Sequence, residues 1–182
     1  MVFDSTDSSP AFVIETERLQ LREMRDDDLE FLAALLSDPL VMRFYPKLLD
    51  RDEAQAWLNR RRMQYETHGH SLWLAQKRDD GGLIGQVGLV PQTIDERSES
   101  EIGYMLAARY WHHGYASEAA RGVLAYARNE LKKQRIISMI RPENEPSRNV
   151  ARSMGMQVER TTVWYGFMHD VWVTEEATSR GS

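Results

Sequence analysis

Cysteine is absent from this chain of 182 residues. The absence excludes disulfide bonds, thiolate metal ligands and a cysteine nucleophile. Disulfides are typical of oxidising compartments, so the default location for a chain without them is the cytoplasm. His68 and His70 are close in sequence, but no third ligand with suitable spacing accompanies them, and we expect no metal site.

A surplus of basic residues is also lacking. The chain has 23 Lys and Arg against 28 Asp and Glu, which gives a formal net charge of −5. Proteins that bind nucleic acid normally carry a basic surplus, so we expect no nucleic-acid partner. The acidic balance is compatible with a cationic or amine substrate. No apolar run approaches the roughly 20 residues that span a bilayer, and we expect no membrane association.

The length suits one domain. Residues 1–10 are polar and acidic and lack the basic and apolar regions of a signal peptide, which predicts a disordered leader. Residues 176–182 are polar and small and predict a loose tail. Residues 11–175 are therefore expected to form a single domain.

Apolar periodicity predicts both strands and helices in this domain. The expected elements are an extended segment at 12–24, helices at 29–36 and 50–67, strands at 71–77, 83–90 and 99–106, a helix at 116–133, a strand at 136–140, a short helix from Ser147 to Gly155, and strands at 157–163 and 167–174. Residues 91–98 are expected to form a polar connection. The fold class is a mixed sheet with helices on its faces, α/β or α+β. Arg60, Arg61 and Arg62 fan around their helix and are assigned to a solvated face.

Gly114 lies between the strand at 99–106 and the helix at 116–133. A helix N-terminus after a sharp turn offers unpaired backbone N–H groups and the positive end of the helix dipole. This arrangement suits a phosphate or pyrophosphate group. A single glycine before a helix is also an ordinary turn, so this motif alone leaves both interpretations open.

Four motifs follow one another along the chain. They are residues 14–22 (IETERLQLR), residues 82–89 (GLIGQVGL) with 101–106 (EIGYML), residues 110–119 (YWHHGYASEA), and residues 141–147 (RPENEPS) continuing to Val150 and 154–156. In this order they resemble the GNAT superfamily of acetyl-CoA-dependent N-acetyltransferases. The closest resemblance is to the branch that includes the ribosomal-protein N-terminal (alanine/serine) acetyltransferases, and it covers roughly residues 15–173.

The resemblance implies a mixed, mainly antiparallel central sheet of about seven strands flanked by about four helices. It also implies a parallel pair, residues 102–106 and 136–140, that splays apart at the cofactor site. Acetyl-CoA is then the co-substrate, and no metal is needed. The implied contacts with coenzyme A come from Met105, Leu106, Trp111, His112, His113, Gly114, Tyr115, Ala116, Ser117, Asn144 and Ser147.

His112 stands where this branch usually has glycine, which reduces the backbone freedom expected at that point of the loop. Either His112 or His113 can help to hold phosphate when it is protonated. Both can equally be solvated imidazoles of an exposed loop. The sequence leaves these two interpretations open.

Acetyl transfer to an amine needs a neutral amine, a positioned thioester and a proton for the departing thiolate. Glu101 is the first candidate for the general base, and Glu99 is the fallback because a two-residue period places it on the same face. Glu101 can instead be an outward-facing carboxylate or an anchor for the ammonium group of the substrate. Ser147 is the candidate proton donor to the thiolate, and a role as a helix N-cap can account for it equally.

The predicted function is the transfer of an acetyl group from acetyl-CoA to a primary amine by direct attack in a ternary complex. The acceptor is a protein N-terminus or a small amine. The alternative is a non-catalytic module that binds or senses acyl-CoA. A homodimer is an expectation at the level of the family.

Overall fold

The computed structural model describes residues 11–174. The predicted leader and tail lie outside the described residues, as does residue 175. Within the described part, eight strands form one sheet in the order β1-β2-β3-β4-β5-β6-β8-β7. The elements are β1 (Phe12–Glu15), β2 (Leu19–Arg22), η1 (Asp26–Asp28), α1 (Leu29–Ser37), α2 (Arg51–His68), β3 (Leu72–Lys77), β4 (Leu83–Ile94), β5 (Arg97–Leu106), η2 (Ala108–Tyr110), α3 (Tyr115–Asn129), β6 (Ile137–Ile140), α4 (Glu145–Ser153), β7 (Met156–Trp164) and β8 (Phe167–Thr174).

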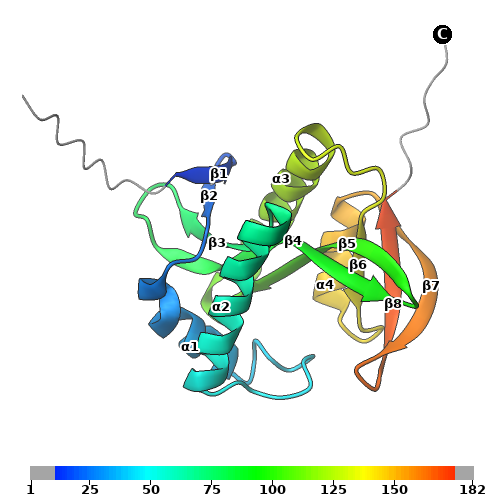
Figure 1. Ribbon diagram of the computed structural model, residues 1–182, viewed down its shortest axis with the longest axis horizontal. Helices are drawn as coiled ribbons and strands as arrows, with labels where there is room; N and C mark the ends of the chain where they lie inside the picture. Colours follow the sequence, from blue (N-terminus) through cyan, green and yellow to red (C-terminus); the bar gives the residue numbers. More distant parts are fainter. Residues whose placement is uncertain (1–10, 175–182) are drawn as a thin grey trace, which may run out of the picture.

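The helices cover both faces of the sheet (Figure 1). Helices α1 and α2 bury their apolar sides in one core with residues of β3, β4 and β5, whereas α3 and α4 pack in the core on the other face. Neighbouring strands are antiparallel except for β5 and β6, which are parallel. The predicted fold class and its parallel pair are confirmed.

The first extended segment differs from its prediction. Residues 12–24 contain two antiparallel strands, β1 and β2, in which Glu15 is paired with Gln20. The N–H of Thr16 donates to the carbonyl of Leu19 at 2.9 Å and closes the turn between them. This turn explains why the described residues hold eight strands instead of about seven.

The connection predicted at 91–98 is wrong, because β4 and β5 continue through it as a hairpin. Asp95 and Glu96 form its turn with φ values of 50° and 63°, as a two-residue hairpin turn requires. Proline cannot donate a hydrogen bond within a sheet, so Pro91 would be expected to interrupt β4. However, Pro91 is paired with Ser100, and its nitrogen faces away from β5, beyond the end of β3. No ladder bond is lost.

The helix boundaries follow from their caps. The side chain of Asp50 accepts a hydrogen bond from the N–H of Glu53 at the start of α2, and Gly69 ends the helix with φ 73°. Helix α3 ends at Asn129, earlier than the predicted position near residue 133. Within residues 11–174, no helix combines the length and apolar character that crossing a membrane requires.

Candidate functional site

Strands β5 and β6 separate soon after they meet. They pair at Glu101 with Ile137, and the Ser138 hydroxyl donates to the Ile102 carbonyl at 2.8 Å. The pairing does not continue towards the carboxyl end of β5. Main-chain groups of the last residues of β5 that face β6 therefore border a gap between the strands.

The ladder between β4 and β5 decides which main-chain groups face this gap. The N–H of Ala107 donates to the carbonyl of Ile84 at 2.9 Å, and the register between the strands is constant. Hydrogen-bonded pairs alternate in antiparallel strands, so the main chain of Met105 is directed to β4. The main chains of Tyr104 and Leu106 are directed away from β4, towards the gap.

Trp111 lies beside the end of β5. Its indole N–H donates to the carbonyl of Leu106 at 2.8 Å, and its ring packs against both cores. This hydrogen bond satisfies the carbonyl of Leu106 and leaves its N–H directed towards the gap. Trp111 thus helps to fix the end of the strand that leads into the loop before α3.

The loop before α3 turns through two left-handed residues. Gly114 is the N-cap residue with φ 78°, and His112 has φ 64°. Among the described residues, no side chain caps this helix end. The N–H groups of the first three helical residues precede the first intrahelical bond, from Glu118 N to Gly114 O. These donors belong to Tyr115, Ala116 and Ser117.

The turn between β1 and β2 is fixed to the start of α3. The Glu118 carboxylate accepts hydrogen bonds from the Thr16 hydroxyl at 2.6 Å, the Arg18 N–H at 2.8 Å and the Arg18 Nε at 2.6 Å. Nη1 of Arg18 also donates to the carbonyl of His113 at 3.0 Å. Its guanidinium lies 4.5 Å from the ring centroid of Tyr115. The turn between β1 and β2 therefore stabilises the conformation of the loop before α3.

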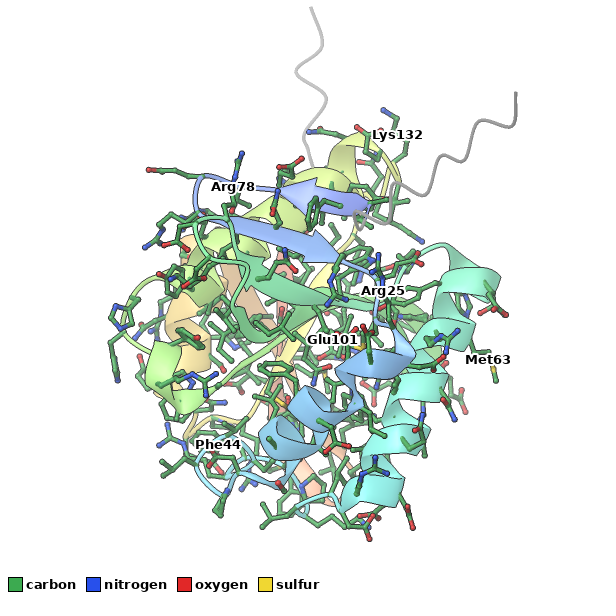
Figure 2. The ribbon with its side chains drawn as sticks, turned by 90° about the vertical axis from the view of Figure 1, so that its left-hand side faces the viewer. Arg25, Phe44, Met63, Arg78, Glu101 and Lys132 are labelled. Carbon is green, nitrogen blue, oxygen red and sulfur yellow. The ribbon has the colours of Figure 1, made fainter. Side chains whose placement is uncertain are left out.

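Glu101 is half-buried on β5, on the face covered by α1 and α2 (Figure 2). The amide of Gln92 donates to its Oε2 at 2.8 Å, and the N–H of Met139 donates to Oε1 at 3.4 Å. Desolvation raises the pKa of Glu101, while the hydrogen bonds from Gln92 and Met139 oppose the rise. A carboxyl group with a raised pKa is suited to accept a proton from an amine.

Glu99, the fallback base, is committed elsewhere. It is 6% exposed, and the guanidinium of Arg135 holds its carboxylate with an N···O distance of 3.0 Å. The same guanidinium binds Glu159 at 2.8 Å. Glu99 therefore has an ion-pair partner, which favours Glu101 as the candidate base.

Two residues near Glu101 were not predicted as part of a site. Tyr45, from the loop between α1 and α2, is 41% exposed overall. Desolvation of its hydroxyl and the charge of Glu101 raise the pKa of Tyr45 to about 12. Arg61 is 6% exposed, so its assignment to a solvated face is wrong. The Trp57–Arg61–Tyr65 spacing of four residues indicates one helix side and could have located it.

The start of α4 also differs from the prediction. The N-cap is Asn144, whose side-chain oxygen accepts a hydrogen bond from the N–H of Ser147 at 3.3 Å. Ser147 is therefore inside the helix and is not its cap. Its carbonyl accepts a hydrogen bond from the hydroxyl of Tyr104 at 2.7 Å, and burial raises the pKa of Tyr104. This bond joins β5 to α4 across the gap.

The family follows from a comparison with known domain families. The model for the acetyltransferase (GNAT) domain matches residues 18–157. The match covers more than half of the chain, and the splayed parallel pair and the loop before α3 lie within it. The chain belongs to the GNAT acetyltransferase family.

Two relatives come from Bacillus subtilis strain 168. An uncharacterized protein, YkkB, is 41% identical over 147 residues, which cover 80% of this chain and 86% of that protein. An uncharacterized N-acetyltransferase, YoaA, is 30% identical over 149 residues, covering 81% of this chain and 84% of that protein. Both alignments span most of the domain.

Solved structures share the fold. A GNAT-family acetyltransferase from Bacillus anthracis superposes with a TM-score of 0.73 and 27% identity, covering 90% of this chain and 96% of that chain. RimL, a ribosomal L7/L12 alpha-N-protein acetyltransferase solved in complex with coenzyme A, gives a TM-score of 0.70 and 16% identity, covering 90% and 96%. At that identity, the likeness to RimL concerns the fold alone.

Proposed function

We propose that this chain transfers the acetyl group of acetyl-CoA to a primary amine by direct attack in a ternary complex. The acceptor is a protein N-terminus or a small amine. The observation that carries the proposal is the position of Glu101. It stands where β5 and β6 begin to part, with a raised pKa and partial access to solvent.

The start of α3 is the proposed binding site for the pyrophosphate of coenzyme A. Unpaired N–H groups and the helix dipole favour an anion there without a metal. Contacts are proposed from Trp111, His112, His113, Gly114, Tyr115, Ala116 and Ser117 around this turn, and from Asn144 and Ser147 on α4. Membership of the GNAT acetyltransferase family supports this choice of donor.

The end of β5 is the proposed site for the pantetheine arm and the thioester. Of the two residues expected there, Leu106 is the better main-chain donor, because the N–H of Met105 is directed to β4. An N–H held at the thioester carbonyl stabilises negative charge on its oxygen. Met105 is left with a packing role beside the site.

The reaction needs two proton transfers, one from the attacking amine and one to the departing thiolate. Acetyl-CoA supplies a carbonyl carbon, to which the amine nitrogen bonds as the bond to sulfur breaks. Glu101 takes the proton that the amine loses. The hydroxyl of Ser147 is the proposed proton donor to sulfur.

We also propose a cytoplasmic location and a homodimer, for which light scattering should give twice the chain mass of 21.1 kDa.

The test is release of thiol from acetyl-CoA across a panel of amines and peptides. Glu101→Gln should lower kcat by about 100-fold or more, in the range of general-base catalysis. The Kd for coenzyme A should change little, because the base acts on the acceptor. Glu66→Gln, an exposed change on α2, is the control and should leave both values unaltered.

Two outcomes would contradict parts of this proposal. Unchanged kcat in Glu101→Gln would remove Glu101 as the base. Tight binding of coenzyme A with no transfer to any amine would favour the non-catalytic acyl-CoA-binding module instead.

A further inference from the structure

Arg61 is a buried cation on the inner side of α2. It is 6% exposed, whereas its neighbours Arg60 and Arg62 are exposed. Its Nη1 donates to the side-chain oxygen of Gln64 at 2.9 Å, and its guanidinium lies 4.1 Å from the ring centroid of Trp57. Its Nε is buried without a hydrogen-bond partner in the described part of the chain.

Arg22 is also buried, and it has the carboxylate partner that Arg61 lacks among the described residues. Arg22 is 9% exposed, and its guanidinium binds both carboxylate oxygens of Asp28 at 2.8 Å. Within residues 11–174, Arg61 has no such ion pair. Buried charges in proteins are normally paired, because desolvation of a lone charge is costly. The aromatic contact with Trp57 compensates for only part of that cost.

Arg61 and Glu101 lie on the same side of the sheet. Glu101 shares its face with Met105, four residues along β5, and Met105 packs in the core formed with α2. The charge of Glu101 acts on Arg61 and on Tyr45. Desolvation and then the neighbouring charge of Arg60 lower the pKa of Arg61 to about 10, while Glu101 opposes the change. Both side chains therefore lie on this face of the sheet, although Arg61 and Glu101 do not form an ion pair among the described residues.

We propose that the acceptor is an amine that carries a carboxylate, and that Arg61 binds this carboxylate while Glu101 faces the amine. This inference rests on the proposed acetyl transfer and names the acceptor class for it. A guanidinium group binds a carboxylate through two parallel hydrogen bonds. The free Nε of Arg61 supplies one of the donors that such a pair needs. Bound acceptor then supplies the ion-pair partner that Arg61 lacks within residues 11–174.

The inference is tested with matched acceptors in the thiol-release assay. One pair is alanine and alaninamide, compared at equal concentrations of neutral amine. The other is a pair of short peptides with amidated C-termini that begin with Asp or Asn, compared in the same way. In at least one pair the carboxylate form should be preferred by about tenfold or more in kcat/KM, as expected for a charge-assisted hydrogen bond.

Arg61→Met should bring that ratio close to one, and Arg61→Lys should keep part of it. Arg60→Met, an exposed change one residue away, should leave the ratio unaltered. Equal use of both members of each pair by the unmodified enzyme would overturn the inference while leaving acetyl transfer to amines intact. An equal loss of kcat/KM for all acceptors in Arg61→Met would also overturn it. That result would mean that Arg61 acts by positioning Glu101. Failure of every amine would overturn the proposed function itself, and this inference with it.

Discussion

At the scale of single residues, Gln92 is a hydrogen-bond donor to Glu101. Its amide donates to the carboxylate at 2.8 Å and so lowers the pKa that burial raises. Glu101 accepts a proton only when it is ionised, so activity should fall as the pH drops through this pKa. Gln92→Leu removes the hydrogen bond and should move the acid limb of the kcat/KM profile to higher pH by about one unit.

The control for this prediction is Thr93→Val, because Thr93 is exposed on the same strand and valine suits a strand. Its acid limb should coincide with that of the unmodified enzyme. A profile for Gln92→Leu that is lowered at every pH without a shift would contradict the prediction. It would mean that Glu101 is not the group titrating in the assay.

Residue identity could be predicted better than residue environment. The strand and its motif indicate Glu101 as the candidate base, and Glu101 lies half-buried on β5. Three consecutive arginines indicate an exposed surface, and this pattern wrongly predicts a solvated Arg61. The spacing of four residues between Trp57 and Arg61 places Arg61 on the inner side of α2. Glu99 could not be excluded from the sequence, because its partner Arg135 lies 36 residues away and meets it only in the folded sheet.

At the scale of elements, Gly88 permits close approach of β3 to β4. A Cβ at Gly88 would lie 2.1 Å from the carbonyl oxygen of Ser71, which is a main-chain atom. Gly88→Ala should therefore lower the free energy of unfolding by about 3 kcal/mol or more, since backbone must shift. The measurement is urea unfolding followed by circular dichroism.

Gly103 provides a matched control because it is paired with Gly88 across β4 and β5. A Cβ there would meet only the end of the Leu72 side chain, at 3.4 Å. Gly103→Ala should cost about 1 kcal/mol or less. Equal losses in the two variants would contradict the explanation by close strand approach.

Local sequence patterns predicted the helices and most strands. The remaining features depend on pairing between strands that are distant in sequence, which local patterns do not reveal. Close approach of the strands depends on Gly85 as well as Gly88, since a Cβ at either would lie within 2.2 Å of a main-chain oxygen. The sequence analysis did not predict the hairpin through Pro91. A proline in β4 disrupts the sheet only if its nitrogen faces a paired strand, and β3 ends before it reaches Pro91. The gap between β5 and β6 depends on a pairing of Glu101 with Ile137, and only the family resemblance indicated it.

At the scale of the whole molecule, the two ends of the proposed reaction lie on opposite faces of the sheet. Glu101, Tyr45 and Arg61 belong to the side covered by α1 and α2. The start of α3, with Gly114, belongs to the other side (Figure 1). In the proposed reaction, donor and acceptor meet at the gap between β5 and β6. A donor bound along the gap can meet an acceptor from the other face without passing around the sheet.

This division predicts how coenzyme A should stabilise the protein. A ligand at 100 times its Kd adds about 2.7 kcal/mol to the free energy of unfolding, which for a chain of this size raises Tm by about 5–10 °C. Pantetheine, which lacks the pyrophosphate, should give a much smaller rise at equal concentration, because the N–H groups at the start of α3 gain no anion. Glu101→Gln should keep the full rise, since Glu101 lies on the proposed acceptor side. Differential scanning fluorimetry measures all three shifts. No rise with saturating coenzyme A, or an equal rise with pantetheine, would contradict an anion site at α3.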